Sequence, residues 1–184
     1  FPGQGRLTTI PNGGNMAVSA GISEDAFKKG MRELVAAVNI ITVAHNGSQD
    51  GLTATAACSV SAEPPQLLIC VNRDTGSHDL IQESCKFALN ILARDQEDVA
   101  MRFAGMDDAD RTERFDLGKW SELVTGTPVL DGALVNFDCE VAKQITIGTH
   151  SIFIGHIVAS RTGDNGGAPL LYGDGQFTGL ATRE

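Results

Sequence analysis

The sequence predicts a mainly β protein, a barrel or sandwich with flanking helices. Three observations support this fold class: β-branched and apolar segments of strand length recur along the chain, turn residues separate them, and helix-length segments lie between few of them. The third observation argues against a parallel sheet, because each parallel connection needs a long crossover, usually a helix. At 184 residues, the chain fits one domain.

The first expected element is a helix over residues 23–37. Ser23 can cap its start, and the acidic residues that follow suit the positive end of the helix dipole. One apolar stripe recurs with helical spacing and comprises Phe27, Met31, Leu34, Val35 and Val38. Residues 1–22 are interpreted as a disordered tail or a cloning remnant, which leaves 23–184 as the domain.

Strands and turns then alternate to the end of the chain. In the first half we expect a strand over 38–44, turn residues over 45–51, small side chains over 52–61, a break at 63–65, a strand over 66–71, a loop over 72–76 and a helix over 77–83. The second half predicts a strand over 87–92, a helix over 95–104, a charged, exposed excursion up to 113, two long strands over 133–143 and 151–160, a turn over 162–167 and a hairpin of 170–172 with 176–178.

Charge and composition exclude several classes of function. The net charge of −9 disfavours nucleic acid and anionic membranes as partners, because both would repel the chain. No apolar run approaches the roughly 20 residues that span a bilayer. The cysteines form no CxxC pair and indicate reduced thiols in the cytoplasm. No metal site is expected, because metal-ligand spacing is absent among His45, His78, His150 and His156.

Familiar nucleotide and hydrolase signatures are also absent. No GxGxxG follows a strand, and neither a GxxxxGK(S/T) loop nor a GxSxG elbow occurs. If a nucleotide binds this chain, it therefore binds on a scaffold other than the Rossmann or P-loop folds.

The segment 51–61 is the first candidate binding site. Its small side chains would let a flat ring lie close to the backbone, and Ser59 and Ser61 offer hydroxyl donors for a phosphate. The same composition also suits tight packing against a helix. Composition alone leaves both interpretations open.

A loop with the start of the helix that follows it, and a single histidine, could also bind ligands. Arg73 is a cation in a loop rich in hydroxyl groups, and Ser77 begins a helix whose free N–H groups favour an anion. A capped turn with a solvated arginine is the alternative. His150 stands at the entry to a long apolar strand, where it can face a pocket or stack on a ring, although a single histidine is more often structural.

Eight short motifs occur in an order and spacing that resemble a known family. They are residues 27–42, 51–56, 59–65, 70–73, 87–92, 126–130, 148–155 and 169–177. The chain resembles the short-chain flavin reductases, the small components of two-component flavin monooxygenases. The resemblance implies an FMN-binding split β-barrel with Greek-key topology that works as a homodimer.

The same resemblance implies the site residues. His150 would position the nicotinamide, and the turn between Tyr172 and Phe177 would cover it. The flavin ring, ribityl chain and phosphate would contact the implied cofactor-binding residues, which are Asn39, Thr42, Thr53, Ala54, Thr55, Ser59, Val60, Ser61, Asn72, Arg73, Ser77, Tyr172 and Phe177.

The implied activity is reduction of FMN or FAD by NADH or NADPH, with the reduced flavin passed to a partner monooxygenase. The two rings perform hydride transfer themselves, so the protein has to position them, and His150 is expected to orient the nicotinamide. Two alternatives stay open: a flavoprotein reductase of another acceptor, such as a cob(II)alamin-type corrinoid or ferric iron, and a non-catalytic flavin- or heme-binding barrel.

Overall fold

The protein is described by a computed structural model, which covers residues 21–163 and 167–180. The expectations for residues 1–20 and for the centre of the 162–167 turn lie outside the described residues. The helices are α1 (Glu24–Arg32), α2 (Gly76–Ser84) and α3 (Glu97–Ala104), with the 3-10 helices η1 (Arg94–Gln96) and η2 (Arg111–Asp116). None of these helices is long and apolar enough to cross a membrane.

Strands are the most abundant secondary structure among the described residues, as the sequence predicts. They are β1 (Ala36–Ala37), β2 (Asn39–His45), β3 (Ser48–Ala54), β4 (Ala57–Ala62), β5 (Pro65–Asn72), β6 (Lys86–Ile91), β7 (Trp120–Glu122), β8 (Pro128–Leu130), β9 (Val135–Ile147), β10 (His150–Thr162), β11 (Leu171–Gly173) and β12 (Gln176–Thr178).

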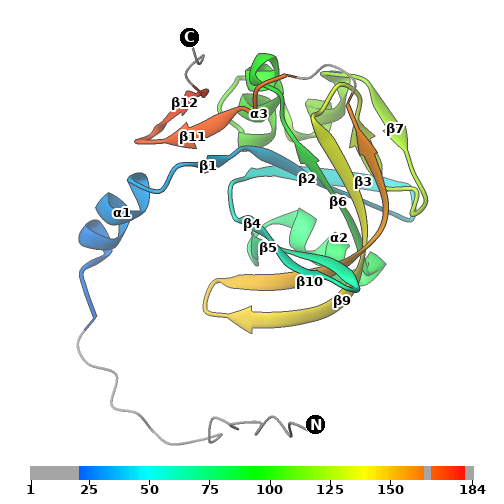
Figure 1. The fold of residues 1–184 in the computed structure, drawn as a ribbon, viewed down its shortest axis with the longest axis horizontal. Coiled ribbons are helices and arrows are strands. Elements are labelled where there is room, and N and C mark those ends of the chain that lie inside the picture. Colours follow the sequence, from blue (N-terminus) through cyan, green and yellow to red (C-terminus); the bar gives the residue numbers. More distant parts are fainter. Residues whose placement is uncertain (1–20, 164–166, 181–184) are drawn as a thin grey trace, which may run out of the picture.

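Seven antiparallel strands form the main sheet in the order β3-β2-β6-β9-β10-β5-β4. The edge strands β3 and β4 are consecutive in the chain, so the sheet curls until its two edges come close at residues 55–56. The edges do not pair with each other, and the barrel stays open between them (Figure 1). The predicted mainly β fold and the split barrel are therefore confirmed.

Two apolar clusters hold this barrel together. The first fills its interior and includes Ile41, Ile69, Phe87 and Phe153. The second lies between the sheet, α3 and β8, and its largest side chain is Phe103. Each fully buried side chain of this size stabilises the fold by roughly 1.5–3 kcal/mol relative to an exposed one.

The first helix is shorter than the predicted 23–37. Ser23 caps α1 as expected, with its hydroxyl accepting from the Ala26 amide at 3.2 Å, but the helix ends at Arg32. Beyond it, Ala36 and Ala37 pair with β11 as strand β1, so hydrogen bonding to the terminal hairpin overrides the helical pattern. The apolar stripe of α1 buries no side chain in this chain.

The turn predicted over 45–51 is also shorter. Asn46 and Gly47 have φ angles of 49° and 79°, which make a two-residue hairpin turn of the type that Asn-Gly favours. Ser48 already pairs with His45, so β3 begins there. The charged excursion up to residue 113 is largely exposed as expected, although Arg111 reaches back to the barrel.

Candidate functional site

Three neighbouring cavities meet at Thr55, the exposed residue between β3 and β4. Thr55 lines all three, and their volumes are about 540, 350 and 220 Å³. Its neighbours along the chain, Ala54, Ala56 and Ala57, also line one or another of these cavities and leave the space open. A concave, mostly apolar hollow with few polar groups is the usual form of a small-molecule site.

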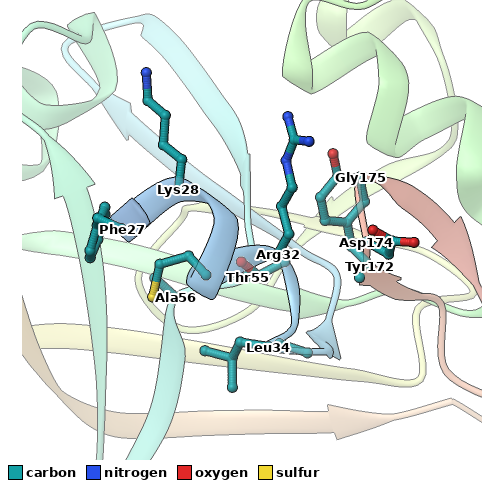
Figure 2. Close-up of a pocket in the computed structure, with 12 residues that line it drawn as sticks. Phe27, Lys28, Arg32, Leu34, Thr55, Ala56, Tyr172, Asp174 and Gly175 are labelled. Atoms are coloured by element: carbon teal, nitrogen blue, oxygen red, sulfur yellow. The ribbon is translucent and has the colours of Figure 1, made fainter. Parts of the chain in front are cut away.

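The first cavity lies between α1 and the turn of the terminal hairpin. Figure 2 shows Thr55 between α1 and the residues Tyr172, Asp174 and Gly175, with Phe27 at the far end of the helix. The wall formed by α1 is apolar except for the cations Lys28 and Arg32. The cavity is therefore a cleft between one helix and the open edge of the barrel.

The second cavity is the mouth of the barrel between its edge strands. Asn39, Ser59 and Ser61 line it together with the core side chains Leu67 and Phe137. The Ser61 hydroxyl already donates to the Glu63 carbonyl at 3.0 Å, whereas the Ser59 hydroxyl has no partner among the described residues. The predicted serines thus reach the cavity, and the hydroxyl of Ser59 is available for a ligand.

The third cavity lies under the terminal hairpin. Thr53, Ala54, Tyr172 and Phe177 line it, and the two aromatic rings pack edge to face with centroids 5.3 Å apart. The Thr53 hydroxyl donates to the Ala100 carbonyl of α3 at 2.6 Å. Thr53 therefore anchors β3 to α3, and its hydroxyl is not free to bind a ring.

Thr42 and Val60, two of the residues implied by the family resemblance, lie away from these cavities. Thr42 faces the side of β2 opposite to Asn39, because side chains alternate along a strand. It is fully buried and donates to the Pro128 carbonyl at 2.5 Å. Val60 is the extra residue of a β-bulge between Ser59 and Ser61, and it is 45% exposed.

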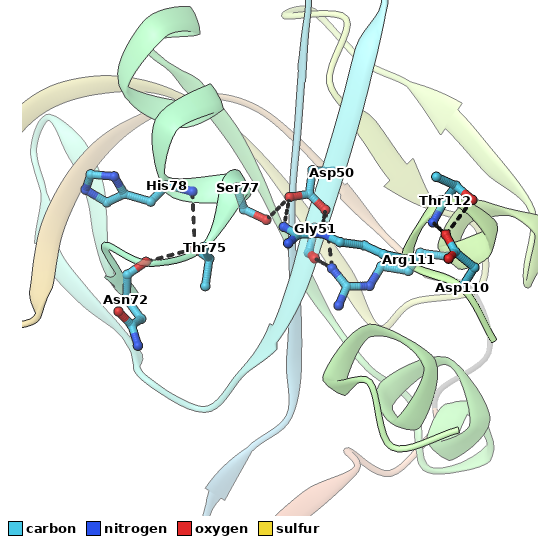
Figure 3. Close-up of polar contacts among 10 residues, drawn as sticks. Asp50, Gly51, Asn72, Thr75, Ser77, His78, Asp110, Arg111 and Thr112 are labelled. Atoms are coloured by element: carbon cyan, nitrogen blue, oxygen red, sulfur yellow. Dashed lines mark hydrogen bonds and ion pairs between the residues drawn. The ribbon is translucent and has the colours of Figure 1, made fainter. Parts of the chain in front are cut away.

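Ser77 is committed to a buried polar cluster at the other end of β3 (Figure 3). Its hydroxyl, which is fully buried, donates to the Asp50 carboxylate at 2.7 Å. Arg111 and Arg114 donate to the same carboxylate, and Arg114 also donates to the Gly51 carbonyl at 2.7 Å. We therefore leave Ser77 out of the candidate anion site, because its hydroxyl is used and a carboxylate lies next to it.

The cluster determines the ionisation of Asp50. Burial by itself raises the pKa of the Asp50 carboxyl, but the hydrogen bonds from Arg111, Ser77 and the Gly51 amide outweigh it, so the pKa lies below its ordinary value of 3.8. Asp50 is consequently a carboxylate at neutral pH, and its two oxygens are used inside the fold.

Another group of predicted site residues, Asn72, Arg73 and His150, lies where β5 ends and β10 begins. His150 pairs with Asn72 across β10 and β5, and the Arg73 amide donates to the Thr149 carbonyl at 2.9 Å. The His150 ring is exposed and lies 2.9 Å from the Thr149 hydroxyl.

Strand spacings place this group near the three cavities. Ile152 pairs with Cys70, and the Cys70 amide donates to the Ala56 carbonyl at 3.0 Å. His150 lies two residues before Ile152, so its backbone is about 12 Å from that of Ala56. A ligand the size of a dinucleotide can span this distance.

Sequence reasoning missed the cations of α1. Lys28 and Arg32 line the first cavity beside Thr55 (Figure 2). Lys28 is paired with Glu24 at 2.6 Å. Their positions on the helix gave no signal in the sequence, because only the fold brings α1 to the edge of the barrel.

The fold and the site define an open β-barrel with a small-molecule cleft between its edge strands. The family model described as "Flavin reductase like domain" matches residues 31–181. A relative named FMN reductase (NADH) RutF, from Stutzerimonas stutzeri, is 38% identical over 164 residues, covering 89% of this chain and 92% of the relative. The 4-hydroxyphenylacetate 3-monooxygenase reductase component of Pseudomonas aeruginosa is 40% identical over 131 residues, covering 71% of this chain and 77% of the relative.

Solved structures agree with these relatives. The flavin reductase PheA2 in its native state superposes with a TM-score of 0.79 at 31% identity, covering 88% of this chain and 100% of that chain. BorF, the flavin reductase component of a bacterial two-component tryptophan halogenase, superposes with a TM-score of 0.78 at 32% identity, with coverage of 88% and 100%. The chain belongs to the flavin reductase-like family.

Proposed function

We propose that this protein is an NAD(P)H-dependent flavin reductase that transfers hydride from a reduced nicotinamide to FMN or FAD. The observation that carries the proposal is the junction of three cavities at Thr55, inside the segment expected to hold a flavin. FMN and NADH are the first pair to test, because several relatives are named FMN reductase (NADH). Relatives that are reductase components of other enzymes support a partner monooxygenase as the recipient of reduced flavin.

The residues around Thr55 fit a flavin. Their side chains are small, so a planar ring system can approach the backbone of 54–57, and the Thr55 and Ser59 hydroxyls have no partner within the described part of the chain and can donate hydrogen bonds. When bound, the flavin supplies the hydride acceptor, and the nicotinamide supplies the hydride. The protein's task is then to hold both rings in contact and to exclude water, and no strong acid or base is needed.

Cations near the cleft support binding of the phosphate groups. The net charge of −9 opposes an anionic ligand, so local donors must offset it. Arg32 lines the cleft on one side, and Arg73 lies next to His150 on the other. We propose that these two arginines, with Asn72, bind the phosphates of the flavin and the pyridine nucleotide.

We propose that His150 positions the nicotinamide. Its ring is exposed at the start of β10, near the Ala56 edge of the cleft. His150→Ala should raise the KM for NADH about tenfold and leave the affinity for FMN unchanged. His156→Ala is the matched control, because His156 lies on the same face of the same strand, six residues further along. An unchanged KM for NADH in His150→Ala would remove this role.

We also propose that the protein is a homodimer in the cytoplasm. Unburied apolar side chains of α1 and the residues after it support the dimer: Phe27, Met31, Leu34 and Val35 are 47–62% exposed. All four cysteines are free thiols, which supports a reducing compartment. Phe27→Asp should yield monomers in analytical ultracentrifugation with a lower turnover, and a dimer that survives this change would place the interface elsewhere.

An anaerobic titration tests the proposed reaction directly. Purified protein with added FMN should lose the visible absorbance of oxidised flavin as NADH is added, and the absorbance should return with air. A protein that binds flavin but does not consume NADH would instead be a non-catalytic flavin-binding barrel.

A further inference from the structure

The β9–β10 hairpin projects from the barrel, and its tip carries His150 (Figure 1). Residues 142–150 are all exposed, so the tip gains little from apolar packing. The Arg73 amide holds the tip by donating to the Thr149 carbonyl at 2.9 Å. Ser151 is the first buried residue after the exposed run, and none of its surface is exposed. The position of His150 therefore depends on how its neighbour Ser151 is held.

The residue that holds Ser151 from the side of α2 is His78. It lies in the first turn of α2 and is 5% exposed, and Figure 3 shows its ring pointing away from Ser77. Nε2 of the ring lies 2.9 Å from the Ser151 hydroxyl oxygen. The ring also packs against Phe153, with centroids 5.4 Å apart, on the face of β10 that Ser151 shares. One buried ring therefore connects α2 to the start of β10.

The polar groups around Ser151 form a chain with defined directions. Asp79 Oδ1 lies 3.2 Å from His78 Nδ1, and a carboxylate only accepts, so Nδ1 carries the hydrogen. In the neutral ring, Nε2 then accepts from the Ser151 hydroxyl. Gln144 of β9 donates to the same hydroxyl oxygen and to Gln82 Oε1, at 3.3 Å in each case. The Ser151 hydroxyl is therefore fixed from α2 and from β9 together.

The order Asp79, His78, Ser151 is also the order of groups that activates a serine nucleophile in hydrolases. A nucleophile has to meet the atom that it attacks, and Ser151 has no exposed surface. His78 is almost as deeply buried. The arrangement therefore fits a role in holding the strand and does not fit attack on a substrate.

We propose that His78 is a positioning residue, whose hydrogen bond to Ser151 fixes the start of β10 and so the place from which His150 contacts the nicotinamide. This inference rests on the proposed flavin reductase function and adds the residue that holds the histidine in place. His150 and Ser151 are neighbours in one strand, so their side chains lie on opposite faces. His78 thus acts on one face, and the nicotinamide is bound on the other. A misplacement of about 1 Å can cost a reaction up to a hundredfold in rate, so this support matters.

Steady-state kinetics with NADH and FMN test the proposal in the wild type, Ser151→Ala, His78→Leu and His78→Gln. Ser151→Ala and His78→Leu each remove the hydrogen bond, and each should raise the KM for NADH about fivefold while the KM for FMN stays unchanged. The amide of glutamine can still bond to the Ser151 hydroxyl, so His78→Gln should keep the KM for NADH within about twofold of the wild type.

Ser77→Ala is the matched control for a loss of stability. Ser77 is another fully buried serine, and its hydroxyl donates to the Asp50 carboxylate at 2.7 Å, at the start of β3. A hydrogen bond to a charged group contributes more stability than one to a neutral ring, so Ser77→Ala should lower the melting temperature at least as much as Ser151→Ala. Its KM for NADH should nevertheless equal that of the wild type. If Ser77→Ala raised this KM as much as Ser151→Ala, general destabilisation would explain the effect and the proposal would fall.

A double variant shows whether the effect passes through His150. Ser151→Ala combined with His150→Ala should raise the KM for NADH no further than His150→Ala does alone. Two increases that multiply would overturn the proposal, as would an unchanged KM in either single variant. These results would leave the flavin reductase function standing, whereas a wild type that oxidises no NADH in the presence of FMN would overturn both. If the His78 variants do not fold, Ser151→Ala, Ser77→Ala and the double variant decide the question by themselves.

Discussion

Strand β3 has two ends with opposite uses of their polar groups. Near its start, Asp50 is 8% exposed, and its carboxylate oxygens are taken up by Ser77 and two arginines. Just past its end, Thr55 is exposed, borders three cavities and has a hydroxyl that bonds to no other described residue. The comparison shows that hydrogen-bond partners, more than residue type, distinguish a polar group that stabilises the fold from one that is available to a ligand.

The segment of small side chains divides in the same way. At Gly51, a Cβ would lie 2.7 Å from Phe103 of α3, so the absence of a side chain serves tight packing there. Thr53 is bonded to α3 as well. From Ala54 onward the small side chains border open space instead. Tight packing therefore holds for the first part of the segment, and the second part borders the cavities in which we propose that the flavin binds.

Filling the junction of the three cavities, at the end of β3, should have the largest effect, which is a loss of flavin affinity. Thr55→Trp places a large side chain at the junction of the three cavities, and the mutation should be tolerated by the fold because Thr55 is exposed. Flavin affinity should fall by about a hundredfold or more, or roughly 3 kcal/mol, measured by fluorescence quenching. Gln49→Trp is the matched control on the exposed start of β3, and its affinity should equal that of the wild type. Equal binding by Thr55→Trp would exclude this junction as the flavin site.

Removing the polar cluster around Asp50, at the start of β3, should lower the stability of the protein and leave flavin binding unchanged. Asp50→Ala leaves the mostly buried Arg114 without its carboxylate and the Ser77 hydroxyl without an acceptor. The free energy of unfolding in urea should fall by about 2–3 kcal/mol, below the cost of a fully buried pair because Arg111 is half exposed. The folded variant should bind FMN as the wild type does. A large loss of flavin affinity without loss of stability would reverse the assignment of the two ends.

Cysteines report on the cleft through their reactivity. Cys58 is exposed and lines the second cavity, whereas Cys85 is exposed at the end of α2. Saturating FMN should slow alkylation of Cys58 about tenfold and leave Cys85 unaffected, as measured by peptide mass spectrometry. Cys139 should stay unmodified in both cases, since burial raises its pKa to about 12. Equal labelling of Cys58 with and without FMN would place the flavin outside the second cavity.

Sequence reasoning predicted the fold well where local patterns decide it. The alternating and β-branched segments became β2, β5, β6, β9 and β10, and the terminal hairpin formed around its Gly-Asp-Gly turn. The end of α1 could not be predicted, because Ala36 leaves the helical pattern only to pair with Tyr172, far away in the chain. Pairing between distant segments carries no local signal.

The candidate site was predicted in part for the same reason. Asn39, Ser59 and Tyr172 line the cleft, whereas Thr42 points to the other side of its strand. Strand parity could have separated Asn39 from Thr42 in advance, since they are three residues apart. The Asp50–Ser77 bond could not be foreseen, because its partners are 27 residues apart and meet only in the folded chain.

The smallest expected effect is the loss of the stability that Asp50 contributes to the start of β3 as the pH falls. The folded pKa of Asp50 lies below its ordinary value of 3.8, so its ionised form contributes stability that is fully present above that value. As the pH falls below 3.8 and through the lowered folded pKa, the unfolded chain binds the proton first and the contribution is lost. The difference in unfolding free energy between the wild type and Asp50→Asn should therefore shrink steadily between about pH 5 and pH 2. Other carboxylates titrate in both proteins and cancel in this difference. If the difference stayed constant over that range, the carboxylate of Asp50 would not carry the stability of the cluster, and the hydrogen bond from Arg114 to the Gly51 carbonyl would have to hold this end of the strand.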